Sequence, residues 1–370
     1  MESKPGRRLR IAYVSMYNPT DRTAWSGSAH YIARALAKHC GDVVVVEPPP
    51  FGRNLPQRLV RRIEYTRRIA QDLTRQRADI IFSPQSQTTL ALLPRLGVPV
   101  VLFSDTTWRL YHNYYPSHAY GAAWKWRLRD VLERLAFARS DLLVFGSEWA
   151  AGSAERDYHI LPCRIRVAPF GANIDAPPPA DAVLQTTTSG ECRLLLIGVD
   201  WERKGGAVAF ETLVELERRG IKARLTICGC VPPQGYTHPR MEVIPFLDKS
   251  KPEDSDRFDA LLTGAHFLIL PTRAECAGVV IAEANAFGIP ALATDTGGVP
   301  SMIEEGINGF LLPLDATGDD YADHIQRVYR DAAAYRALVR SSRQRYDDRL
   351  NWDAWGRSMS EMLAPFRSGN

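Results

Sequence analysis

The stretch Pro271–Pro300, PTRAECAGVVIAEANAFGIPALATDTGGVP, decides the fold because it links the end of one strand to a helix and a second strand. The letters HFLILPT, residues 266–272, lead into this stretch and predict a buried strand, and GVVIAEANAFG has the small and apolar spacing of a buried helix closed by Gly288 and Pro290. PALATD predicts the next strand. Such a succession is typical of a parallel sheet with helices on both faces.

The same alternation occupies most of the 370 residues, which exceed what one core usually supports. We expect an N-terminal Rossmann-like domain over residues 1–171 and a second one over 191–345. Residues 172–190, rich in Pro, Ala and Thr, predict a linker, and 346–370 predict a C-terminal helix able to cross back to the first domain. The predicted fold class is therefore α/β, with two doubly wound domains facing across a cleft.

Composition excludes several classes of protein. A formal net charge of +4 is too small to argue for nucleic-acid binding. The six cysteines are scattered without a CxxC pair, as expected for reduced thiols in a cytoplasmic protein. No run of about eighteen apolar residues predicts a transmembrane helix, so any membrane contact, at the inner face, would be peripheral.

Two acids in the opening stretch suggest a ligand. Glu275 lies in the predicted strand-to-helix loop, and Glu283 lies about two turns into the helix. Between them Cys276, Ala277 and Gly278 carry almost no side chain, so the first helix amides are expected to be open to a phosphate. Since carboxylates accept hydrogen bonds from hydroxyls, the pattern fits ribose, diphosphate and hexose in a nucleotide sugar.

The pattern Glu275, seven residues, Glu283, followed by EANAFGIPALATDTGG, resembles the signature of glycosyltransferase family 4. The resemblance implies the GT-B fold, retention of anomeric configuration and transfer of a hexose from a UDP-, GDP- or ADP-sugar to a saccharide or lipid-linked acceptor, in glycan or glycolipid biosynthesis. It also implies an N-terminal acceptor domain, a C-terminal donor domain, and no cofactor or metal. Glu275 would contact hydroxyls of the donor sugar and Glu283 those of the ribose, although an ion-paired helix acid is the alternative for Glu283. The donor-binding residues so implied are Gly27, Arg203, Lys204, Cys276, Ala277, Gly278, Val279 and Glu283.

A second motif of the family is matched by LLLIGVDWERKGG, in which Gly198, Lys204 and Gly205 keep the expected spacing. The Lys204 ammonium would neutralise the leaving diphosphate and contribute to catalysis. The family usually has Arg where this chain has Val199, so Arg203 becomes the candidate for the second cation. An exposed turn of solvated charges is the alternative.

In the predicted N-terminal domain the family commonly has a Gly-Gly loop that closes over the donor phosphates, and only Gly27 stands there in this chain. A Ser cap on a helix is the alternative. Relatives often have His-Asp after the strand VPVVLFS, where this chain has Ser104-Asp105; Asp105 is the candidate for steering or deprotonating the acceptor hydroxyl. The nearby aromatic residues predict either sugar stacking or an aromatic core: Trp108, Tyr111, Tyr114 and Tyr115.

Two further predictions concern surfaces. The Arg-rich segment 53–77 predicts a basic helix with Leu, Ile and Tyr on its other face. Such a helix could rest on an anionic bilayer, or its charges could simply form a solvated face. Ile244, Phe246 and Leu247 are expected to frame the nucleotide base, through backbone contacts.

Other functions stay open at this point: a nucleotide-sugar-binding module that has lost catalysis, a sugar-nucleotide epimerase of the same fold, or a phosphorylase, which needs a pyridoxal lysine. A dinucleotide oxidoreductase is disfavoured because no GxGxxG follows the first strand.

Overall fold

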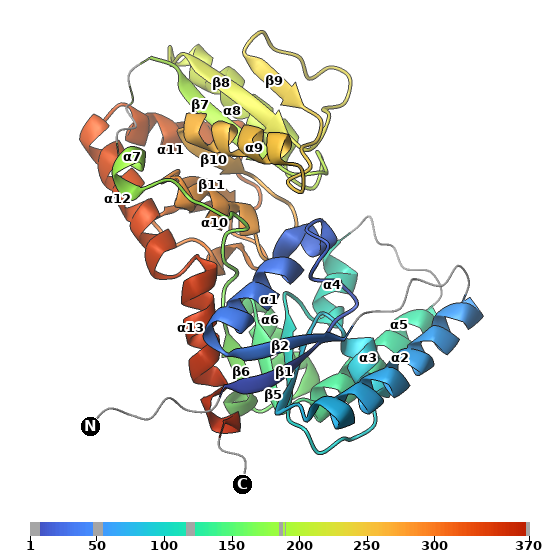
Figure 1. Ribbon diagram of the computed structural model, residues 1–370. Coiled ribbons are helices and arrows are strands. Elements are labelled where there is room, and N and C mark those ends of the chain that lie inside the picture. Colours follow the sequence, from blue (N-terminus) through green and yellow to red (C-terminus); the bar gives the residue numbers. More distant parts are fainter. Residues whose placement is uncertain (1–7, 47–54, 116–122, 185–187, 189, 368–370) are drawn as a thin grey trace, which may run out of the picture. The chain divides into compact units, whose positions relative to one another are not determined.

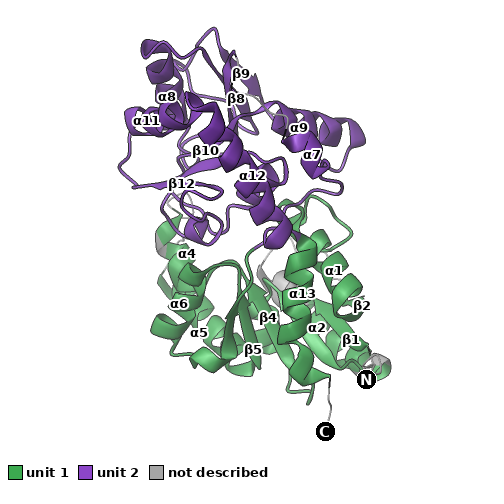
Figure 2. Ribbon diagram, turned by 90° about the vertical axis from the view of Figure 1, so that its left-hand side faces the viewer, with its two compact units in different colours: residues 1–169, 352–370 green, residues 170–351 purple. Residues whose placement is uncertain are grey.

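The computed structural model divides the chain into two compact units, residues 1–169 with 352–370 and residues 170–351 (Figure 2). It describes residues 8–46, 55–115, 123–184, 188 and 190–367. Parts of four predicted segments lie outside the described residues: 53–54 of the basic segment, 116–122 after the aromatic run, 185–187 and 189 of the linker, and 368–370 of the last helix.

Unit 1 contains a six-stranded parallel sheet in the order β2-β1-β3-β4-β5-β6 (Figure 1). Strand β1 lies between β2 and β3, so the chain order reverses on its two sides. The elements are β1 (Leu9–Val14), α1 (Ser28–His39), β2 (Gly41–Val46), α2 (Leu55–Gln76), β3 (Ile80–Pro84), α3 (Gln87–Leu92), β4 (Val100–Ser104), α4 (Trp108–Tyr114), α5 (Ala123–Arg139), β5 (Leu142–Phe145), α6 (Glu148–Tyr158), β6 (Ile165–Val167) and α13 (Trp352–Met362).

The last helix completes the core of unit 1. Figure 1 shows α13 beside α1, and the Trp355 ring meets the edges of Phe82 and Phe103 at centroid distances of 6.3 and 5.5 Å. Tyr31 of α1 stacks on Trp352 at 6.2 Å. The helix expected over 346–370 is in fact divided, because α12 ends at Asp348 and α13 begins at Trp352.

Helix α2 corrects one prediction. Its Tyr65, Ile69 and Leu73 are buried in the core on the same face of the sheet as α3 and α5. The apolar face that we expected to meet a bilayer therefore covers the sheet instead, while Val60 and Ile63 remain exposed.

Unit 2 contains a second parallel sheet, in the order β12-β11-β10-β7-β8-β9. The chain order reverses between β7 and β10, and in such sheets ligands bind at the carboxyl ends of the strands at this point. The elements are α7 (Ala180–Val183), β7 (Cys192–Ile197), α8 (Gly206–Arg218), β8 (Ala223–Cys228), β9 (Met241–Ile244), α9 (Pro252–Gly264), β10 (Phe267–Leu270), α10 (Val279–Ala286), β11 (Ala291–Thr294), β12 (Gly309–Leu312), α11 (Gly318–Tyr329) and α12 (Ala332–Asp348).

Both faces of the second sheet are covered, as predicted for a doubly wound domain. Helices α8, α11 and α12 pack on one face, and α9 and α10 on the other. The predicted linker is partly built into this unit: Val183 of α7 belongs to the core, and the Ala172 amide donates to the Leu350 carbonyl at 3.0 Å. Unit 2 therefore begins near residue 170 rather than at 191.

Candidate functional site

The turn after β7 and the loop after β10 meet at the switch point of unit 2. Gly205 has φ of 71°, and a Cβ there would lie 1.9 Å from the Pro271 carbonyl oxygen. Thr272 Oγ1 and the Arg273 amide both donate to the Arg203 carbonyl, at 2.9 and 2.7 Å. Glycine is therefore required where the two segments touch, and this contact fixes the charged side chains that follow.

Lys204 and Glu275, which the sequence placed in separate motifs, form a buried ion pair. Nζ of Lys204 lies 2.5 Å from Oε2 of Glu275, and the two side chains are 10 and 13% exposed. The stem of Lys204 covers Gly198, where a Cβ would come within 2.5 Å of its Cγ. The absence of a side chain at Gly198 thus allows the ammonium to reach the carboxylate.

Arg203 supplies a second cation beside Glu275. Its Nη1 lies 3.5 Å from Glu275 Oε2 and donates to the Ala274 carbonyl at 2.9 Å. Its Nε lies 3.9 Å from Oδ2 of Asp200, whose side chain is 39% exposed. Val199, at the position where the family usually has Arg, is 68% exposed. The structure thus places Arg203 beside Glu275, and its role toward a diphosphate stays a prediction.

These cations determine the protonation of Glu275. Burial raises the pKa of its carboxyl, but Lys204 and Arg203 outweigh that effect, and the pKa is lowered below its usual range. The Gly278 amide adds a hydrogen bond of 3.4 Å to Oε1. Glu275 is ionised at neutral pH and sits within a group of donors suited to anions.

The start of α10 differs from the prediction in one respect. Gly278 caps the helix in a left-handed conformation with φ of 72°, Cys276 and Ala277 are buried, and Val279 begins the helix. We expected the first amides to be open to an external phosphate, whereas the Gly278 amide faces the Glu275 carboxylate. A phosphate at this position would have to share Lys204 and the helix start with Glu275.

Glu283 has a partner that the sequence reasoning missed. Only 4% of this residue is exposed, and its Oε1 accepts a hydrogen bond from Lys249 Nζ at 2.7 Å. Lys249 also lies over the Phe258 ring, 4.8 Å from its centroid. The structure thus shows the alternative of an ion-paired helix acid, with Lys in place of Arg, and the predicted contact of Glu283 with ribose stays a prediction.

The residues expected to frame a base separate into two groups. The side chains of Ile244 and Leu247 are buried in the core of unit 2, while Phe246 is 63% exposed. The Ile244 carbonyl accepts from the Gly229 amide at 2.9 Å, so it is already used. Of the three side chains, only that of Phe246 is accessible to a ligand.

In unit 1, Asp105 follows β4 and is held from two directions. Trp25 Nε1 donates to Oδ2 at 3.2 Å, and the Gln85 side-chain amide donates to Oδ1. Trp25 also stacks on Tyr17, with ring centroids 5.9 Å apart. Asp105 is therefore positioned by Trp25, which follows β1, and by Gln85, which follows β3. The three residues lie at the carboxyl edge of the sheet, and the chain order reverses between β1 and β3.

The residues that hold Asp105 have unusual backbone angles. Trp25, Ser26 and Gly27 have φ of 52, 55 and 89° in succession, and Gln85 has φ of 50°. Each left-handed conformation costs a non-glycine residue about 1–2 kcal/mol. Such strain is retained at sites where the surrounding structure requires it. Trp, Ser and Gln rarely adopt these angles, so nothing in the sequence indicated them.

A buried acid lies behind the same loop. Glu133 of α5 accepts hydrogen bonds from the Trp108 amide at 2.6 Å and the Tyr158 hydroxyl at 2.5 Å. Burial raises the pKa of its carboxyl to about 7. Trp108 is likewise buried, so this part of the predicted aromatic run is core, whereas Tyr114 and Tyr115 are half-buried.

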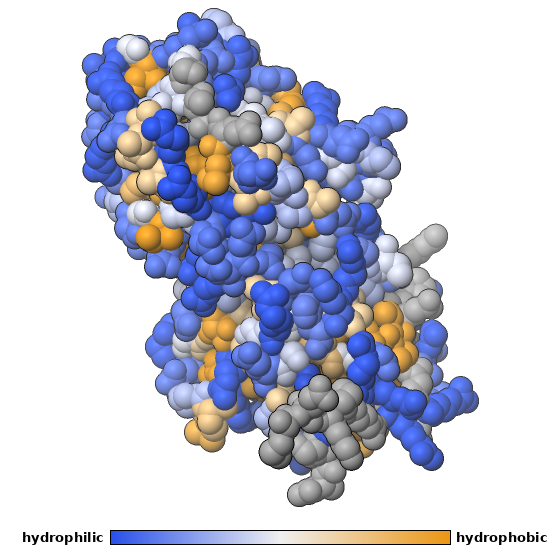
Figure 3. All heavy atoms as spheres, turned by 60° about the vertical axis from the view of Figure 1, so that its left-hand side comes forward, coloured by the Kyte–Doolittle hydropathy of each residue, from blue (hydrophilic) through white to orange (hydrophobic). Residues whose placement is uncertain are grey.

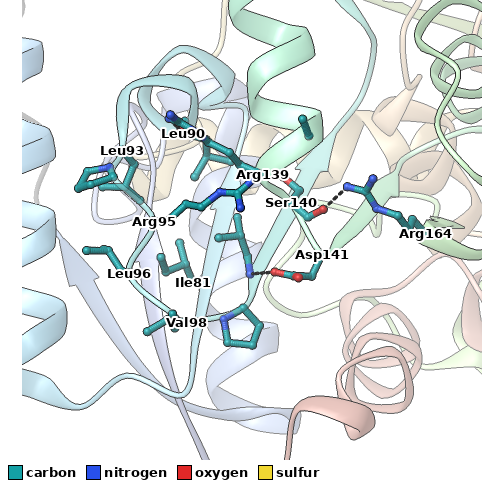
Figure 4. A pocket seen from close by; sticks show the side chains of 15 residues that line it. Ile81, Leu90, Leu93, Arg95, Leu96, Val98, Arg139, Ser140, Asp141 and Arg164 are labelled. Carbon is teal, nitrogen blue, oxygen red and sulfur yellow. Dashed lines mark hydrogen bonds between the residues drawn. The ribbon is translucent and has the colours of Figure 1, made fainter.

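Away from these residues, a cavity of about 570 Å³ opens at the amino ends of β3 and β4 (Figure 4). Arg139 donates to the Leu90 and Ala91 carbonyls, and Arg164 donates to the Phe137 carbonyl at 2.6 Å. These arginines stabilise helix ends, so we assign the cavity no ligand.

Within the described ranges the chain has neither a metal-binding cluster nor a membrane-spanning helix. No cluster of three or more His, Cys, Asp or Glu there has metal-binding geometry. No helix in this part of the chain is long and apolar enough to cross a bilayer. On the face drawn in Figure 3, hydrophobic residues form small separate groups among hydrophilic ones.

Comparisons with known proteins show which family the chain resembles. The family model described as Glycosyltransferase Family 4 matches residues 26–176, and the one described as Glycosyl transferases group 1 matches residues 191–331. A D-inositol 3-phosphate glycosyltransferase of Saccharomonospora viridis is 26% identical over 295 residues, covering 74% of this chain and 67% of the relative. Matches to the first relatives of this description span about half to two thirds of their length.

Solved structures show the same fold. Sucrose-phosphate synthase from Thermosynechococcus elongatus superposes with a TM-score of 0.69 at 18% identity, covering 97% of this chain and 99% of that one. Anabaena Alr3699/HepE in complex with UDP-glucose superposes with a TM-score of 0.66 at 16% identity, covering 97% and 100%.

Proposed function

The chain belongs to glycosyltransferase family 4, with two Rossmann-like units of the GT-B fold, and we propose that it is a retaining hexosyltransferase using a nucleotide-diphosphate sugar. One observation carries the proposal: Lys204, Arg203 and Glu275 converge with the start of α10 at the switch point of unit 2. Cations and helix amides at one point favour a diphosphate, and a neighbouring carboxylate favours sugar hydroxyls.

The proposed mechanism is front-side displacement. The bond between the anomeric carbon and the diphosphate oxygen breaks, and the acceptor oxygen bonds to the same face of that carbon. The departing diphosphate takes the acceptor proton, and its charge is stabilised by Lys204 and Arg203. A preorganised donor of this kind contributes about 3–4 kcal/mol to stabilising a transition state. We propose that these cations supply the charge stabilisation that other transferases obtain from a metal ion.

Binding of a donor would redistribute the charges already present. Lys204 donates to Oε2 of Glu275, so a phosphate must share this ammonium. Oε1, which accepts a long hydrogen bond from the Gly278 amide, would then also accept one from a donor hydroxyl. Arg203 has a longer contact of 3.5 Å to the same carboxylate, and it can turn to the diphosphate at lower cost. Glu275 would thus orient the hexose while both cations hold the leaving group.

UDP-glucose is the first donor to test, because a neighbour of the same fold is solved with it. For the acceptor we propose a saccharide or polyol hydroxyl steered by Asp105, whose carboxylate is held by Trp25 and Gln85. The curated relatives are D-inositol 3-phosphate glycosyltransferases, which favours a cyclic polyol or sugar over an aliphatic alcohol.

The experiment combines binding and turnover. Thermal shift with UDP-glucose, GDP-mannose and ADP-glucose should show stabilisation by one nucleotide class, because a ligand that binds only the folded state raises Tm. Release of nucleoside diphosphate, with and without acceptor, should be lost in Glu275→Ala and retained in Glu253→Ala, an exposed acid in the first turn of α9. Nucleotide-sugar binding without turnover would show instead a binding module that has lost catalysis. NMR of the product anomer tests retention, and turnover in EDTA tests metal independence.

For peripheral membrane contact, we propose α5 in place of the apolar face of α2. Four apolar side chains of α5 are 44 to 55% exposed at a spacing of four, three and four residues, and Lys125 and Arg127 stand among them. Such a basic and apolar helix face suits an anionic bilayer. Leu128→Glu should abolish sedimentation with vesicles containing phosphatidylglycerol, and equal sedimentation of variant and wild type would exclude this face. The four residues are Trp124, Leu128, Val131 and Leu135.

A further inference from the structure

We infer that a groove between α4, α5 and α6 of unit 1 is a saccharide subsite that holds a neutral pyranose ring of the acceptor. This inference rests on the proposed transferase function and names a binding site for its second substrate. The groove has a volume of about 540 Å³, within the usual range for small-molecule sites. Its lining residues are Arg109, Leu110, Tyr114, Trp126, Trp149 and Asp157.

Three aromatic residues from three helices line the groove. Tyr114 of α4 and Trp149 of α6 have ring centroids 4.8 Å apart, with their planes at 47°. Trp126 comes from the first turn of α5. All three are half-buried, unlike the neighbouring Trp108, which is core. Rings that combine apolar area with partial exposure are suited to stack on the C–H face of a sugar.

The groove also offers polar atoms that lack partners among the described residues. Trp126 Nε1 is buried without a hydrogen-bond acceptor there. Asp157 accepts a hydrogen bond from Ser153 at Oδ2, at 2.7 Å, and its Oδ1 accepts none from the described part of the chain. A buried polar atom without a partner, such as Trp126 Nε1, is uncommon in folded proteins. Adjacent hydroxyls of one sugar, which both donate and accept, can satisfy the indole and the carboxylate.

Arg109 argues for a neutral ligand rather than a phosphorylated one. Its Nε and Nη2 donate to Asp130 at 2.8 and 3.2 Å, and its Nη1 donates to the Asp157 carbonyl at 2.9 Å. The guanidinium is therefore paired and held in place by Asp130, which also accepts a hydrogen bond from Arg134 at 3.1 Å. A phosphate in the groove would meet the Asp157 carboxylate and a cation that is already paired, so a neutral ring is favoured.

The position of the groove agrees with a role in acceptor binding. Trp149 is the second residue of α6, which begins just after the carboxyl end of β5. Asp105 immediately follows the carboxyl end of the neighbouring strand β4. Stacking residues and the carboxylate proposed to steer the reacting hydroxyl thus lie along the same edge of one sheet.

Saturation-transfer NMR tests the subsite without a donor. Methyl α-D-glucopyranoside and methyl α-D-mannopyranoside serve as probes at about 20 mM, a concentration suited to millimolar affinity. Saturating the aromatic protein resonances should transfer magnetisation to the ring protons of at least one glycoside. Trp149→Ala should reduce that transfer at least fivefold, and Leu161→Ala, which removes an exposed apolar side chain of unit 1 outside the groove, should leave it unchanged.

Trp126→Phe is the second variant, because it keeps an aromatic ring and removes the indole N–H. Loss of one hydrogen bond of about 1 kcal/mol should raise the Kd about fivefold. No transfer to either glycoside, or equal transfer in Trp149→Ala and Leu161→Ala, would overturn the inference. Turnover of UDP-glucose, measured on the same samples, separates the two proposals. Donor turnover without glycoside binding refutes the subsite alone. Glycoside binding without donor turnover refutes the transferase.

Discussion

Replacing Lys204 by Met tests the central ion pair of unit 2, because Met keeps an unbranched stem over Gly198 and removes the charge. At an effective dielectric constant of 20, unit charges 2.5 Å apart attract by about 7 kcal/mol, and desolvation offsets much of this. Removing one partner of a buried pair costs about 3–5 kcal/mol. Arg203 at 3.5 Å and the Gly278 amide remain, so we expect a loss near the lower end, about 3 kcal/mol at pH 7.

The loss should depend on pH with a definite sign. In the wild type the pKa of Glu275 is lowered, so its contribution to stability is present above the pKa of the unfolded chain and disappears as the pH falls through the folded value. In Lys204→Met, Arg203 and the Gly278 amide oppose the effect of burial without the Lys204 charge, so the pKa of Glu275 is higher than in the wild type. Because a protonated carboxyl needs no ammonium, the stability difference between variant and wild type should shrink between pH 7 and pH 4.

Urea denaturation at pH 7, 5.5 and 4 measures this difference, and Arg224→Met is the control. Arg224 pairs with Glu191 at 2.9 Å with a side chain 40% exposed, so its removal should cost less than about 1 kcal/mol. Transfer by Lys204→Met should fall about 10²–10³-fold. A pH-independent difference, or a loss no larger than that of Arg224→Met, would refute the reasoning.

Three further predictions concern unfolding and transfer. Burial raises the pKa of Glu133 to about 7, so its contribution to stability is fully present below pH 4.5 and is lost as the pH rises to 7. The shift corresponds to about 3 kcal/mol. Glu133→Gln should abolish this pH dependence, which urea titrations at pH 5 and 8 measure. Gly205→Ala combines left-handed strain with a clash and should cost about 3 kcal/mol in urea denaturation, whereas Gly220→Ala, with φ of 76° and open space around its Cβ, should cost about 1 kcal/mol; equal losses would contradict the proposed contact. Trp25→Phe removes the hydrogen bond to Asp105 and should lower transfer to acceptor about fivefold while donor hydrolysis is unchanged, and a parallel fall in both rates would contradict a role in positioning the acceptor.

The fold could be predicted because its strands are short apolar runs separated by helical patterns. Strands buried on both faces have to be apolar throughout, so each run marks a strand of a parallel sheet. Lys204 meets Glu275 because their motifs follow β7 and β10, which are neighbouring parallel strands. The carboxyl ends of such strands lie at one edge of the sheet. Motif order alone does not show that β7 and β10 are neighbours, and the family resemblance implied only that both side chains lie near the donor.

What could not be predicted depends on partners that leave no local pattern. The pairing of Lys249 with Glu283 joins a loop and a helix 34 residues apart, and nothing in DKSK distinguishes this lysine from a solvated one. The left-handed angles of Trp25 and Gln85 are imposed by tertiary contacts on residues that rarely adopt them. The apolar face of α2 had the right periodicity, but periodicity does not tell whether a sheet or a bilayer covers that face.

The two candidate sites stabilise their carboxylates in different ways, and the difference bears on their chemistry. Glu275 is surrounded by cations and a helix start, so it remains charged while its neighbours retain capacity for another anion. Among the contacts that position Asp105 are hydrogen bonds from the Trp25 indole and the Gln85 side-chain amide. A carboxylate positioned in this way can accept a hydrogen bond from an acceptor hydroxyl and so orient it. We therefore propose that unit 2 stabilises the leaving group and that unit 1 steers the acceptor hydroxyl.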